Sequence, residues 1–557
     1  MPEALYTIGL DYGSLSCRGV LVRLNGQIDA VADFSYPHGC FTDALPDGTP
    51  LSGSWCLQHP GDFVLGLETV VPALLSQSRV DPRQIIGIGV DFTASTVIPL
   101  DTGFRPLCEN PAFASRPHAW CKMWKHHGAA AQAERLTEVC RARGFDLARY
   151  GGKISPECLI AKVLQVFEED RAVYDAADAF VEAGDYLVSL LAGRPMFSAA
   201  MAAAKALWSK AGYPGADFWG AVHPELAHLP REKLADRFGV SPVTPGERAV
   251  ELCPDMAYRL GLQPGIAVSA AQMDGYAPMP ALGVTSPGQA MMVVGTSTAI
   301  LLLHDAPCPV SGVTGCLPDT GCPGLVTYAA GQASVGDCFQ WFADTCVPGR
   351  YAEDARARGM TVQQWLTHLA AGLAPGKTGL LALDWFNGNK SPFGNSRLKG
   401  MILGLNLKTK PEHIYRALLE ASAFGARLIL DTFTRAGVPI SSVTACGGIA
   451  GKNSLLMQLY ADVLGMPLRV SRCGQSPALG MAIYAAVSAK ERSGFRDMFS
   501  AAEAMRSRDE TVYQPNPSAH RVYDALYREY AALADAFGNG RNGLMERLGE
   551  LLFSPKV

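Results

Sequence analysis

Acidic, glycine and hydroxyl residues come together in one short turn near the start of the chain. Residues 11–16, DYGSLS, lie between two apolar segments. The backbone N–H groups of such a turn can bind phosphate oxygens, and its carboxylate can bind the accompanying metal ion. A polar hairpin tip has the same composition, so this segment alone leaves phosphate binding and a structural role both open.

A second turn of the same kind lies near the middle of the chain. Residues 295–298, GTST, align with residues 13–16, GSLS, and each turn lies between two apolar segments that we expect to be strands. The repetition indicates an internal duplication. Two such turns facing each other across a cleft could hold a polyphosphate from both sides.

A glycine pair offers a further place for a negatively charged ligand. Gly447 and Gly448 follow an expected strand at residues 442–445, and a helix is expected to begin at Lys452-Asn453 and run through residue 464. Glycines before a helix N-terminus let a ligand approach the backbone, and the helix dipole favours negative charge. Many α/β proteins have such a turn for packing reasons, so it is weak evidence by itself.

Two other motifs do not predict sites. Residues 372–378, GLAPGKT, resemble a phosphate-binding P-loop, but the spacing is one residue short. A strand-like run, residues 380–384, also follows where a helix should begin. His126 and His127 are adjacent, point apart on an expected helix and have no third ligand spaced nearby, so they do not predict a metal site.

Alternating strands and helices are expected to position these turns. Asn25-Gly26 is typical of a two-residue hairpin between strands. Turn residues at 283–288 place a boundary near residue 285, which predicts an N-terminal domain over residues 1–285 and a C-terminal domain over residues 286–557. The expected strands are residues 6–10, 18–24, about 27–34, 84–90, 289–294 and 299–304, and a core-facing helix is expected over residues 412–435.

Composition excludes several classes of protein. The chain has 557 residues, and 48 Lys and Arg against 52 Asp and Glu give a net charge of −4, so no broad basic field favours nucleic acid or anionic lipid. The 15 cysteines form no C-x-x-C pair and predict reduced thiols. No signal peptide is expected, because the N-terminus has no basic region and leads directly into a strand pattern. No membrane span is expected, because the apolar run at residues 290–303 is broken and too short. We therefore expect a soluble, intracellular protein.

Taken in order, these motifs resemble the FGGY carbohydrate kinases and, within that family, the L-ribulokinases. The family-wide likeness rests on the two glycine–hydroxyl turns and on residues 91–93, 270–274, 331–337, 383–389, 445–450 and 452–453. The likeness to the L-ribulokinases rests on residues 116–120, 124–127, 150–155, 205–208 and 456–463. Several long motifs in one order are more specific than any single motif.

The resemblance implies an α/β fold of two ribonuclease-H-like, actin-like ATPase domains, with the active site in the cleft between them. It implies that Asp274 is the general base and Asp11 the metal-side carboxylate, both candidate Mg²⁺ ligands. Residues implied to bind the nucleotide are Asp11, Gly13, Ser14, Ser16, Arg18, Gly295, Thr296, Ser297, Gly447, Gly448 and Asn453. Residues implied to bind the sugar, in the N-terminal domain and beyond, are Thr93, Ala94, Lys205 and Gln332.

The implied reaction is ATP- and Mg²⁺-dependent phosphorylation of a ketopentose at its terminal hydroxyl. L-Ribulose to L-ribulose 5-phosphate, in cytoplasmic arabinose catabolism, is the first expectation. The sugar side departs from the family, with Ala329 in place of a glutamate, Gly275-Tyr276 after the base, and Leu15 in place of an acid. These departures keep D-ribulose, xylulose and ribitol open as substrates.

Two other functions and one question of assembly stay open on sequence alone. Ala329 and Tyr276 would also suit a relative that senses a sugar or nucleotide without turnover. An actin- or chaperone-like ATPase would share the architecture but would not explain the sugar-side motifs. The final expected helix, residues 521–537, could close the domain core or face a partner subunit in a homodimer.

Overall fold

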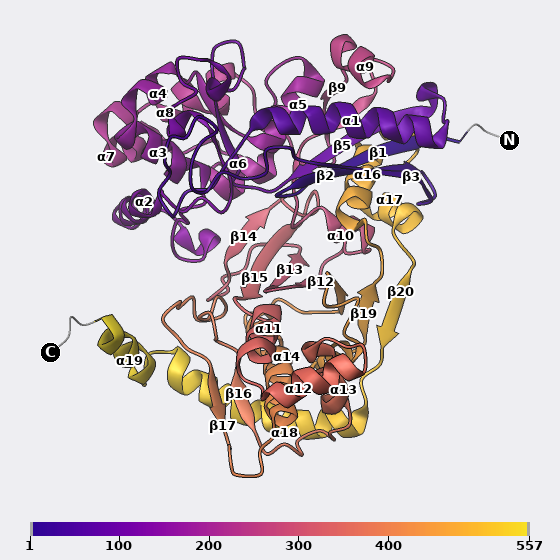
Figure 1. Cartoon of the computed structure of the whole chain (residues 1–557). Helices are drawn as coiled ribbons and strands as arrows, with labels where there is room; N and C mark the ends of the chain where they lie inside the picture. The colour runs from indigo at the N-terminus through magenta and orange to yellow at the C-terminus, as the bar shows by residue number, and fades with distance from the viewer. Residues whose placement is uncertain (1–3, 554–557) are drawn as a thin grey trace. The chain divides into compact units, whose positions relative to one another are not determined.

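The computed structural model describes residues 4–553, and its contacts divide the chain into two units (Figure 1). Unit 1 contains the chain up to Ser286 together with Leu317–Thr327 and Gly474–Ser507. Unit 2 contains Pro287–Cys316, Tyr328–Cys473 and the chain from Arg508. The expected boundary near residue 285 stays a prediction about domains, and two later segments of the chain belong to unit 1.

Unit 1 is built on a mixed sheet in the order β3-β2-β1-β5-β10-β9, with β11 also paired to β5. The first three strands are antiparallel, whereas β5 runs parallel to β1, and β10 and β11 run parallel to β5. Gly26, at φ +86°, makes the expected hairpin turn. The strands are β1 (Tyr6–Tyr12), β2 (Ser16–Arg23), β3 (Ile28–Ser35), β5 (Ile85–Phe92), β9 (Arg248–Glu251), β10 (Ala267–Ser269) and β11 (Gln272–Met273).

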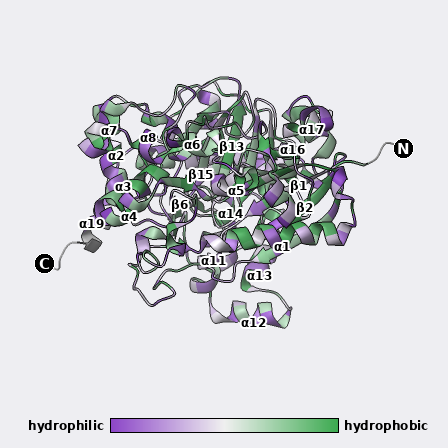
Figure 2. Ribbon diagram, turned by 90° about the horizontal axis from the view of Figure 1, so that it is seen from above, coloured by the Kyte–Doolittle hydropathy of each residue, from purple (hydrophilic) through white to green (hydrophobic). Residues whose placement is uncertain are grey.

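Helix α16 (Ser476–Ser488) packs unusually close to β1 and β5. A Cβ atom at Gly89 would lie 2.5 Å from the Met481 carbonyl oxygen, and one at Gly87 would lie 2.7 Å from the Ala485 carbonyl oxygen. A Cβ at Gly9 would overlap the carbonyl of Ala478. Glycine is therefore required in these strands because the helix backbone lies directly against them. Figure 2 shows α16 as largely hydrophobic, as this packing demands.

The rest of unit 1 contains a smaller sheet in the order β4-β7-β6-β8 and a set of helices around both sheets. Its strands are β4 (Leu57–Gln58), β6 (Val97–Leu100), β7 (Cys121–Lys122) and β8 (Ala179–Glu182). The helices are α1 (Pro60–Ser78), α2 (Ala130–Ala142), α3 (Leu159–Glu169), α4 (Arg171–Ala176), α5 (Ala183–Ala192), α6 (Ala199–Lys205), α7 (Ala216–Val222), α8 (Leu229–Lys233), α9 (Pro254–Leu260), α10 (Pro278–Ala281) and α17 (Met498–Met505).

Unit 2 repeats the strand plan of unit 1. Its main sheet has the order β14-β15-β13-β12-β18-β19-β20, in which β12 and β13 are antiparallel while β12, β18 and β19 run parallel. The strands are β12 (Gln289–Val294), β13 (Thr298–His304), β14 (Gly315–Pro318), β15 (Val326–Gln332), β18 (Ser442–Cys446), β19 (Leu468–Ser471) and β20 (Glu510–Tyr513), with β16 (Leu381–Leu383) and β17 (Met401–Leu403) as a separate pair. The antiparallel pair followed by parallel strands in both units supports the expected duplication.

The helices of unit 2 pack around the long helix α14 (Pro411–Arg435), which is buried along most of its length. Helix α18 (Pro517–Gly538) turns its buried tyrosines toward the unit, and Tyr523 accepts a hydrogen bond of 2.6 Å from Arg416. That aromatic face therefore closes the core of unit 2. The other helices are α11 (Gly336–Thr345), α12 (Gly349–Ala357), α13 (Val362–Ala371), α15 (Ser454–Leu464) and α19 (Leu544–Phe553).

Most expected elements are confirmed, and one local expectation is wrong. The strand at 289–294 and the helix at 412–435 match β12 and α14. His126 and His127 lie in a turn after β7 instead of on a helix, because the chain reverses there before α2. All 15 cysteines are free thiols. Among the described residues, no helix combines the length and apolar character needed to cross a membrane.

Candidate functional site

Three carboxylates of unit 1 lie at the carboxyl ends of neighbouring parallel strands. Asp11 is the next-to-last residue of β1 and is directly opposite Asp91, the next-to-last residue of β5. Gln272 of β11 is also opposite Asp91, and the Asp274 N–H donates 3.0 Å to the carbonyl of Phe92. The structure thus brings the predicted general base and the predicted metal-side carboxylate to one edge of the sheet. Ligands of α/β sheets bind at this edge.

The three carboxyl groups at this edge are close together and partly removed from water, which raises their pKa values. Burial raises the pKa of Asp11, while contact with Asp91 and the charge of Arg18 oppose the rise. Burial and the charges of Asp11 and Asp274 raise the pKa of Asp91 well above its usual range. Asp91 is fully buried, and neither of its oxygens has a hydrogen-bond partner of ordinary geometry. A cation bound here would favour the ionised forms of these crowded acids.

Asp274 combines access with a pKa suited to proton transfer. Part of its surface is exposed, yet burial of the carboxyl group raises its pKa to about 6. A 2.7 Å hydrogen bond from the Gly275 N–H and the charge of Lys205 oppose that rise, whereas the charge of Asp11 adds to it. A carboxyl group with this pKa is mostly ionised near neutral pH and still basic enough to accept a proton.

The predicted sugar-side residues of unit 1 lie close to this edge. Thr93 continues β5, with its N–H donating 3.1 Å to the carbonyl of Tyr12, and Ala94 follows it in the turn. Lys205 is the last residue of α6, and its charge acts on the carboxyl groups of both Asp274 and Glu182. Thr93, Lys205 and Asp274 therefore lie near the same edge of the sheet.

Two buried charged residues that support the Thr93 turn, Lys162 and Glu182, were missed by sequence reasoning. Lys162 is fully buried, and its ammonium group donates to the carbonyls of Ser95 at 2.5 Å and Met123 at 2.8 Å. Glu182 accepts a 3.1 Å hydrogen bond from the Thr96 N–H, and burial raises its pKa to about 7. These contacts hold Ser95 at φ +72° and so fix the shape of the turn.

The first glycine–hydroxyl turn is closed by an internal hydrogen bond and stabilised by two side chains from other segments of unit 1. The Gly13 N–H donates 2.9 Å to the carbonyl of Ser16. Gln58 donates 2.8 Å to the carbonyl of Ser14, and the Trp124 indole N–H donates 3.0 Å to the Ser14 hydroxyl oxygen. Because that oxygen accepts from Trp124, its own proton is directed elsewhere and can be donated to a phosphate oxygen.

Ser16 and Arg18 lie on β2, the strand that leaves this turn. Ser16 begins the strand, and Arg18 is directly opposite Asp11 across the β1–β2 pair. The Arg18 side chain is exposed, and its charge lowers the pKa of Asp11. Arg18 is therefore placed to share its charge between that carboxylate and an anionic ligand.

The second turn, in unit 2, is also closed by a hydrogen bond from its glycine, which spans one residue fewer than in the first turn. The Gly295 N–H donates 2.9 Å to the carbonyl of Ser297, and both Thr296 and Ser297 are exposed. The carbonyls of Gly295 and Thr296 accept hydrogen bonds from Gly336 at 3.1 Å and Val335 at 2.7 Å. The turn is therefore fixed to the start of α11, whose N-terminal dipole favours a negatively charged ligand nearby.

The glycine pair lies beside this second turn. Gly447 adopts φ +102°, and a Cβ there would come within 2.6 Å of the carbonyl oxygen of Val294, the residue before Gly295. Around Gly448 there is open space, with no atom within 4 Å of an added Cβ. The Asn453 side chain caps α15 by accepting 3.0 Å from the Leu456 N–H. Gly447 and Gly448 thus line the same part of unit 2 as Gly295, while the Asn453 oxygen is occupied by its cap.

Gln332, the predicted sugar contact in unit 2, is a buried core residue. Its amide group donates 2.8 Å to Asp384 and 2.8 Å to the carbonyl of Ser422. Its own amide oxygen is buried without a hydrogen-bond partner. That oxygen is left to meet a ligand, and sugar binding by Gln332 stays a prediction.

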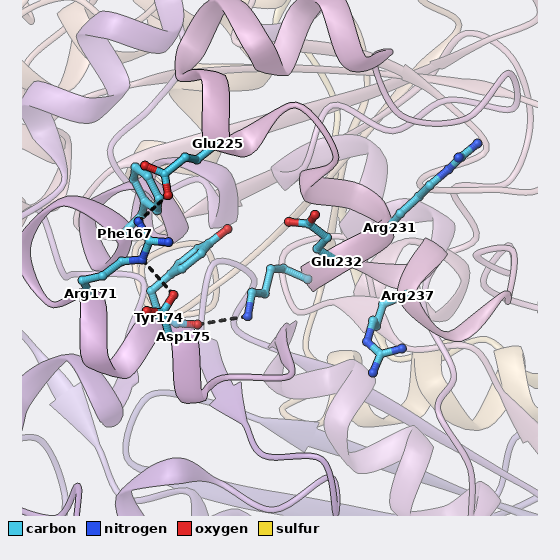
Figure 3. A pocket seen from close by; sticks show the side chains of 9 residues that line it. Phe167, Arg171, Tyr174, Asp175, Glu225, Arg231, Glu232 and Arg237 are labelled. Atoms are coloured by element: carbon cyan, nitrogen blue, oxygen red, sulfur yellow. Dashed lines mark hydrogen bonds and ion pairs between the residues drawn. The ribbon is translucent and has the colours of Figure 1, made fainter.

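The surface pocket in Figure 3 contains none of the predicted site residues. It lies in unit 1 at α3, α4 and α8 and has a volume of about 430 Å³. Its charges largely satisfy one another, since Arg171 pairs with Asp175 at 2.7 Å and with Glu225 at 2.7 Å. Exposed pairs of this kind contribute little energy and do not indicate a ligand site.

Comparison with known proteins identifies the family. Residues 290–489 match the model of the FGGY family of carbohydrate kinases, C-terminal domain. The chain is 44% identical over 548 residues to a ribulokinase of Geobacillus thermodenitrificans, covering 98% of this chain and 96% of the relative. A ribulokinase of Halalkalibacterium halodurans is 45% identical over 552 residues, covering 98% and 97%. The chain belongs to the FGGY family of carbohydrate kinases.

Solved structures of FGGY kinases share this fold. Xylulose kinase from Rhodospirillum rubrum aligns with a TM-score of 0.78 and 23% identity, covering 95% of this chain and 98% of that one. The expected architecture of two ribonuclease-H-like domains is thereby confirmed. As an FGGY carbohydrate kinase, the chain is a phosphotransferase, which agrees with the carboxylates and glycine–hydroxyl turns described above.

Asp91 is the principal site residue that sequence reasoning did not assign. Its motif, Asp91-Phe92-Thr93, was recognised, but only the hydroxyl of Thr93 was given a role. The signal was an acid at the end of a continuous buried strand, the same position that Asp11 occupies at the end of β1. Because parallel strands place their carboxyl ends together, the pairing of Asp11 with Asp91 follows once the two strands are adjacent.

Proposed function

We propose that this FGGY kinase transfers the γ-phosphoryl group of ATP to the terminal hydroxyl of L-ribulose, forming L-ribulose 5-phosphate. The choice of sugar is supported by relatives named ribulokinase that are 44% and 45% identical over nearly the whole chain. The observation that carries the chemistry is the placement of Asp274 beside Asp11 and Asp91 at one sheet edge. We include in the proposal a cytoplasmic role in L-arabinose catabolism, which the likeness to L-ribulokinases implies.

A magnesium ion fits the three carboxylates. Mg²⁺ prefers oxygen ligands and usually binds through one or two carboxylates together with substrate phosphates. Asp11 and Asp274 would hold it, and its charge would favour the ionised form of the buried Asp91, which lies opposite Asp11. When bound, the ion supplies neutralisation of charge on the transferring phosphoryl group.

The chain's own residues would activate and position the sugar. Asp274 accepts the proton of the terminal hydroxyl as the new bond to phosphorus forms, because its pKa of about 6 suits a general base near neutral pH. The Gly275 N–H holds one oxygen of that carboxylate, so the other can face the hydroxyl. Lys205 supplies positive charge on the same side, suited to sugar oxygens.

The two glycine–hydroxyl turns would bind the phosphates of ATP. Each turn is closed by one internal hydrogen bond, and each leaves hydroxyl groups free to donate to phosphate oxygens. Gly447 and Gly448 would border the adenosine in unit 2, where the open space around Gly448 admits a ligand. Because phosphoryl transfer passes through a loose transition state, positioning and charge neutralisation supply most of the catalysis.

The test is a coupled assay of ADP release with L-ribulose, D-ribulose, D-xylulose, ribitol and L-arabitol. We expect the highest kcat/KM with L-ribulose, and Asp274→Asn should lower kcat by roughly 10²- to 10⁴-fold while ATP binding persists. Asp255→Asn, at an exposed aspartate of α9, is the matched control and should leave kcat unchanged. Absence of sugar-dependent release with every acceptor would refute the kinase assignment, and preference for another acceptor would refute L-ribulose alone.

A further inference from the structure

One face of the small sheet in unit 1 carries three sulfur atoms. Phe41 and Leu57 form an antiparallel pair joined by hydrogen bonds of 2.8 and 2.9 Å, and β4 pairs with β7 on its other side. Side chains alternate between the faces of a strand. Cys40, Cys56 and Met123 therefore share the face opposite to Leu57, each contributed by a different segment of the chain.

Both cysteine sulfurs lie in contact with the sulfur of Met123. The Cys40 Sγ lies 3.5 Å from the Met123 Sδ, and the Cys56 Sγ lies 3.3 Å from the same atom. The interaction with the Cys40 thiol lowers the pKa of Cys56, as do the charges of Lys125 and Lys162. Cys56 and Met123 are buried, whereas Cys40 is partly exposed and gives a route from solvent.

The strand register argues against a disulfide between the two thiols. Cys40 is opposite Gln58 across the Phe41–Leu57 pair, so Cys56 is its diagonal neighbour. Diagonal neighbours have Cα atoms about 7–8 Å apart. A disulfide requires Cα atoms within about 7 Å, so closing one would move the backbone. A bridging atom between the sulfurs removes this constraint.

We propose that Cys40, Cys56 and Met123 form a binding site for a soft monovalent metal ion of the Cu⁺ class. Thiolate and thioether sulfurs select such ions over hard cations like Mg²⁺. Three sulfurs about 2.3 Å from one ion in a plane lie about 4 Å apart, so the observed contacts need to widen by only about half an ångström. Binding displaces one proton from each thiol to solvent, and no oxidation step is involved.

The site adjoins the first glycine–hydroxyl turn but is independent of the kinase proposal. The Cys40 thiol donates a weak 3.9 Å contact to the carbonyl of Ser14, and Gln58 donates 2.8 Å to the same oxygen. Loss of the thiol proton on metal binding removes the first contact and leaves the second. Metal binding can therefore be measured on the protein without sugar or ATP, so failure of one proposal does not affect the other.

The experiment is an anaerobic competition for Cu⁺ between the full-length, reduced protein and the chromophoric chelator bicinchoninate. We expect one tightly bound equivalent in the wild type, loss of that equivalent in Cys40→Ser and in Cys56→Ser, and roughly 10- to 100-fold weaker binding in Met123→Leu. Cys346→Ser removes an exposed thiol of unit 2 and is the matched control, which should keep the equivalent. Equal loss in the control, or no competition by the wild type, would overturn the proposal.

A second measurement uses only the wild-type protein, so its result does not depend on whether the variants fold. X-ray absorption of the loaded protein should show three sulfur neighbours at about 2.3 Å. Coordination by two sulfurs, or by nitrogen and oxygen, would overturn the assignment of Met123. A Cys40–Cys56 disulfide formed by mild peroxide treatment of the metal-free protein would contradict the register argument.

Discussion

Replacing Gly89 by alanine tests whether α16 is seated on the central strands as described. Gly89 lies in β5, two residues before Asp91, and every residue of β5 is buried. The new Cβ would lie 2.5 Å from the Met481 carbonyl oxygen and 3.2 Å from its carbonyl carbon. Since real Cβ contacts are not shorter than 3.0 Å, α16 must move away from the sheet by at least half an ångström.

The expected destabilisation follows from two opposing effects. Inserting a methyl group into a packed core costs about 1–3 kcal/mol. The lower entropy of the unfolded chain with alanine returns about 0.4–1 kcal/mol. The net loss is about 1–2 kcal/mol, which corresponds to a fall in the melting temperature of unit 1 of roughly 2–6 °C.

Thermal unfolding followed by circular dichroism and by calorimetry would measure this loss. Gly53→Ala is the matched control in the same unit, because no atom lies within 4 Å of its added Cβ, and it should stay within about 0.5 kcal/mol of the wild type. Catalysis should fall together with stability in Gly89→Ala, because β5 positions Asp91. If Gly89→Ala unfolds at the temperature of Gly53→Ala, the close seating of α16 is wrong.

Three further predictions concern side chains. Gln58→Leu removes the 2.8 Å hydrogen bond to the Ser14 carbonyl and leaves only the weak contact from the Cys40 thiol. We expect kcat/KM for ATP to fall by roughly 5- to 100-fold. An unchanged kcat/KM would show that phosphate binding by the turn does not depend on this hydrogen bond. The buried Arg416 guanidinium donates a 2.8 Å hydrogen bond to Glu420, so Glu420→Leu leaves a buried positive charge without its partner. Urea unfolding should show that the free energy of unfolding falls by about 3–5 kcal/mol. Adding Arg416→Met should recover most of that loss. Burial, reinforced by the charge of Lys122, lowers the pKa of His126 to about 2. The unfolded chain binds that proton below about pH 6.5, so the free energy of unfolding should fall with decreasing pH by up to about 1.4 kcal/mol per unit, and His126→Gln should reduce this slope.

The local elements of the fold could be predicted because their signals are local. The hairpin at Asn25-Gly26, strand β12 and helix α14 each follow from turn residues or from the spacing of apolar side chains. Helix α15 begins at the side-chain cap of Asn453 and ends at Gly465 in a left-handed conformation, as its sequence indicates. The adjacent histidines were misplaced because a short turn before α2 gives no periodic signal.

The pairing of distant segments could not be predicted in this way. Nothing within Gly474–Ser507 indicates that it packs with unit 1, because its partners lie some 400 residues earlier in the chain. Glycines inside strands such as β1 and β5 are typical of a close backbone approach, but they do not indicate which element approaches. For the candidate site, Asp11 came from the composition of its turn and from resemblance, and Asp274 came from resemblance alone. The role of Asp91 required the strand order.

The assignment of α16 to unit 1 has a consequence for biosynthesis. A ribosome makes β1 and β5 first, and these strands wait for most of the chain to be synthesised before α16 emerges. Until then, the glycine-lined surface around Gly9, Gly87 and Gly89 has no native cover, and such bare apolar surface promotes aggregation. Nascent chains stalled before Ser476 should therefore bind chaperones more strongly than chains released after Ser488, so completion of folding in unit 1 is tied to near-complete translation.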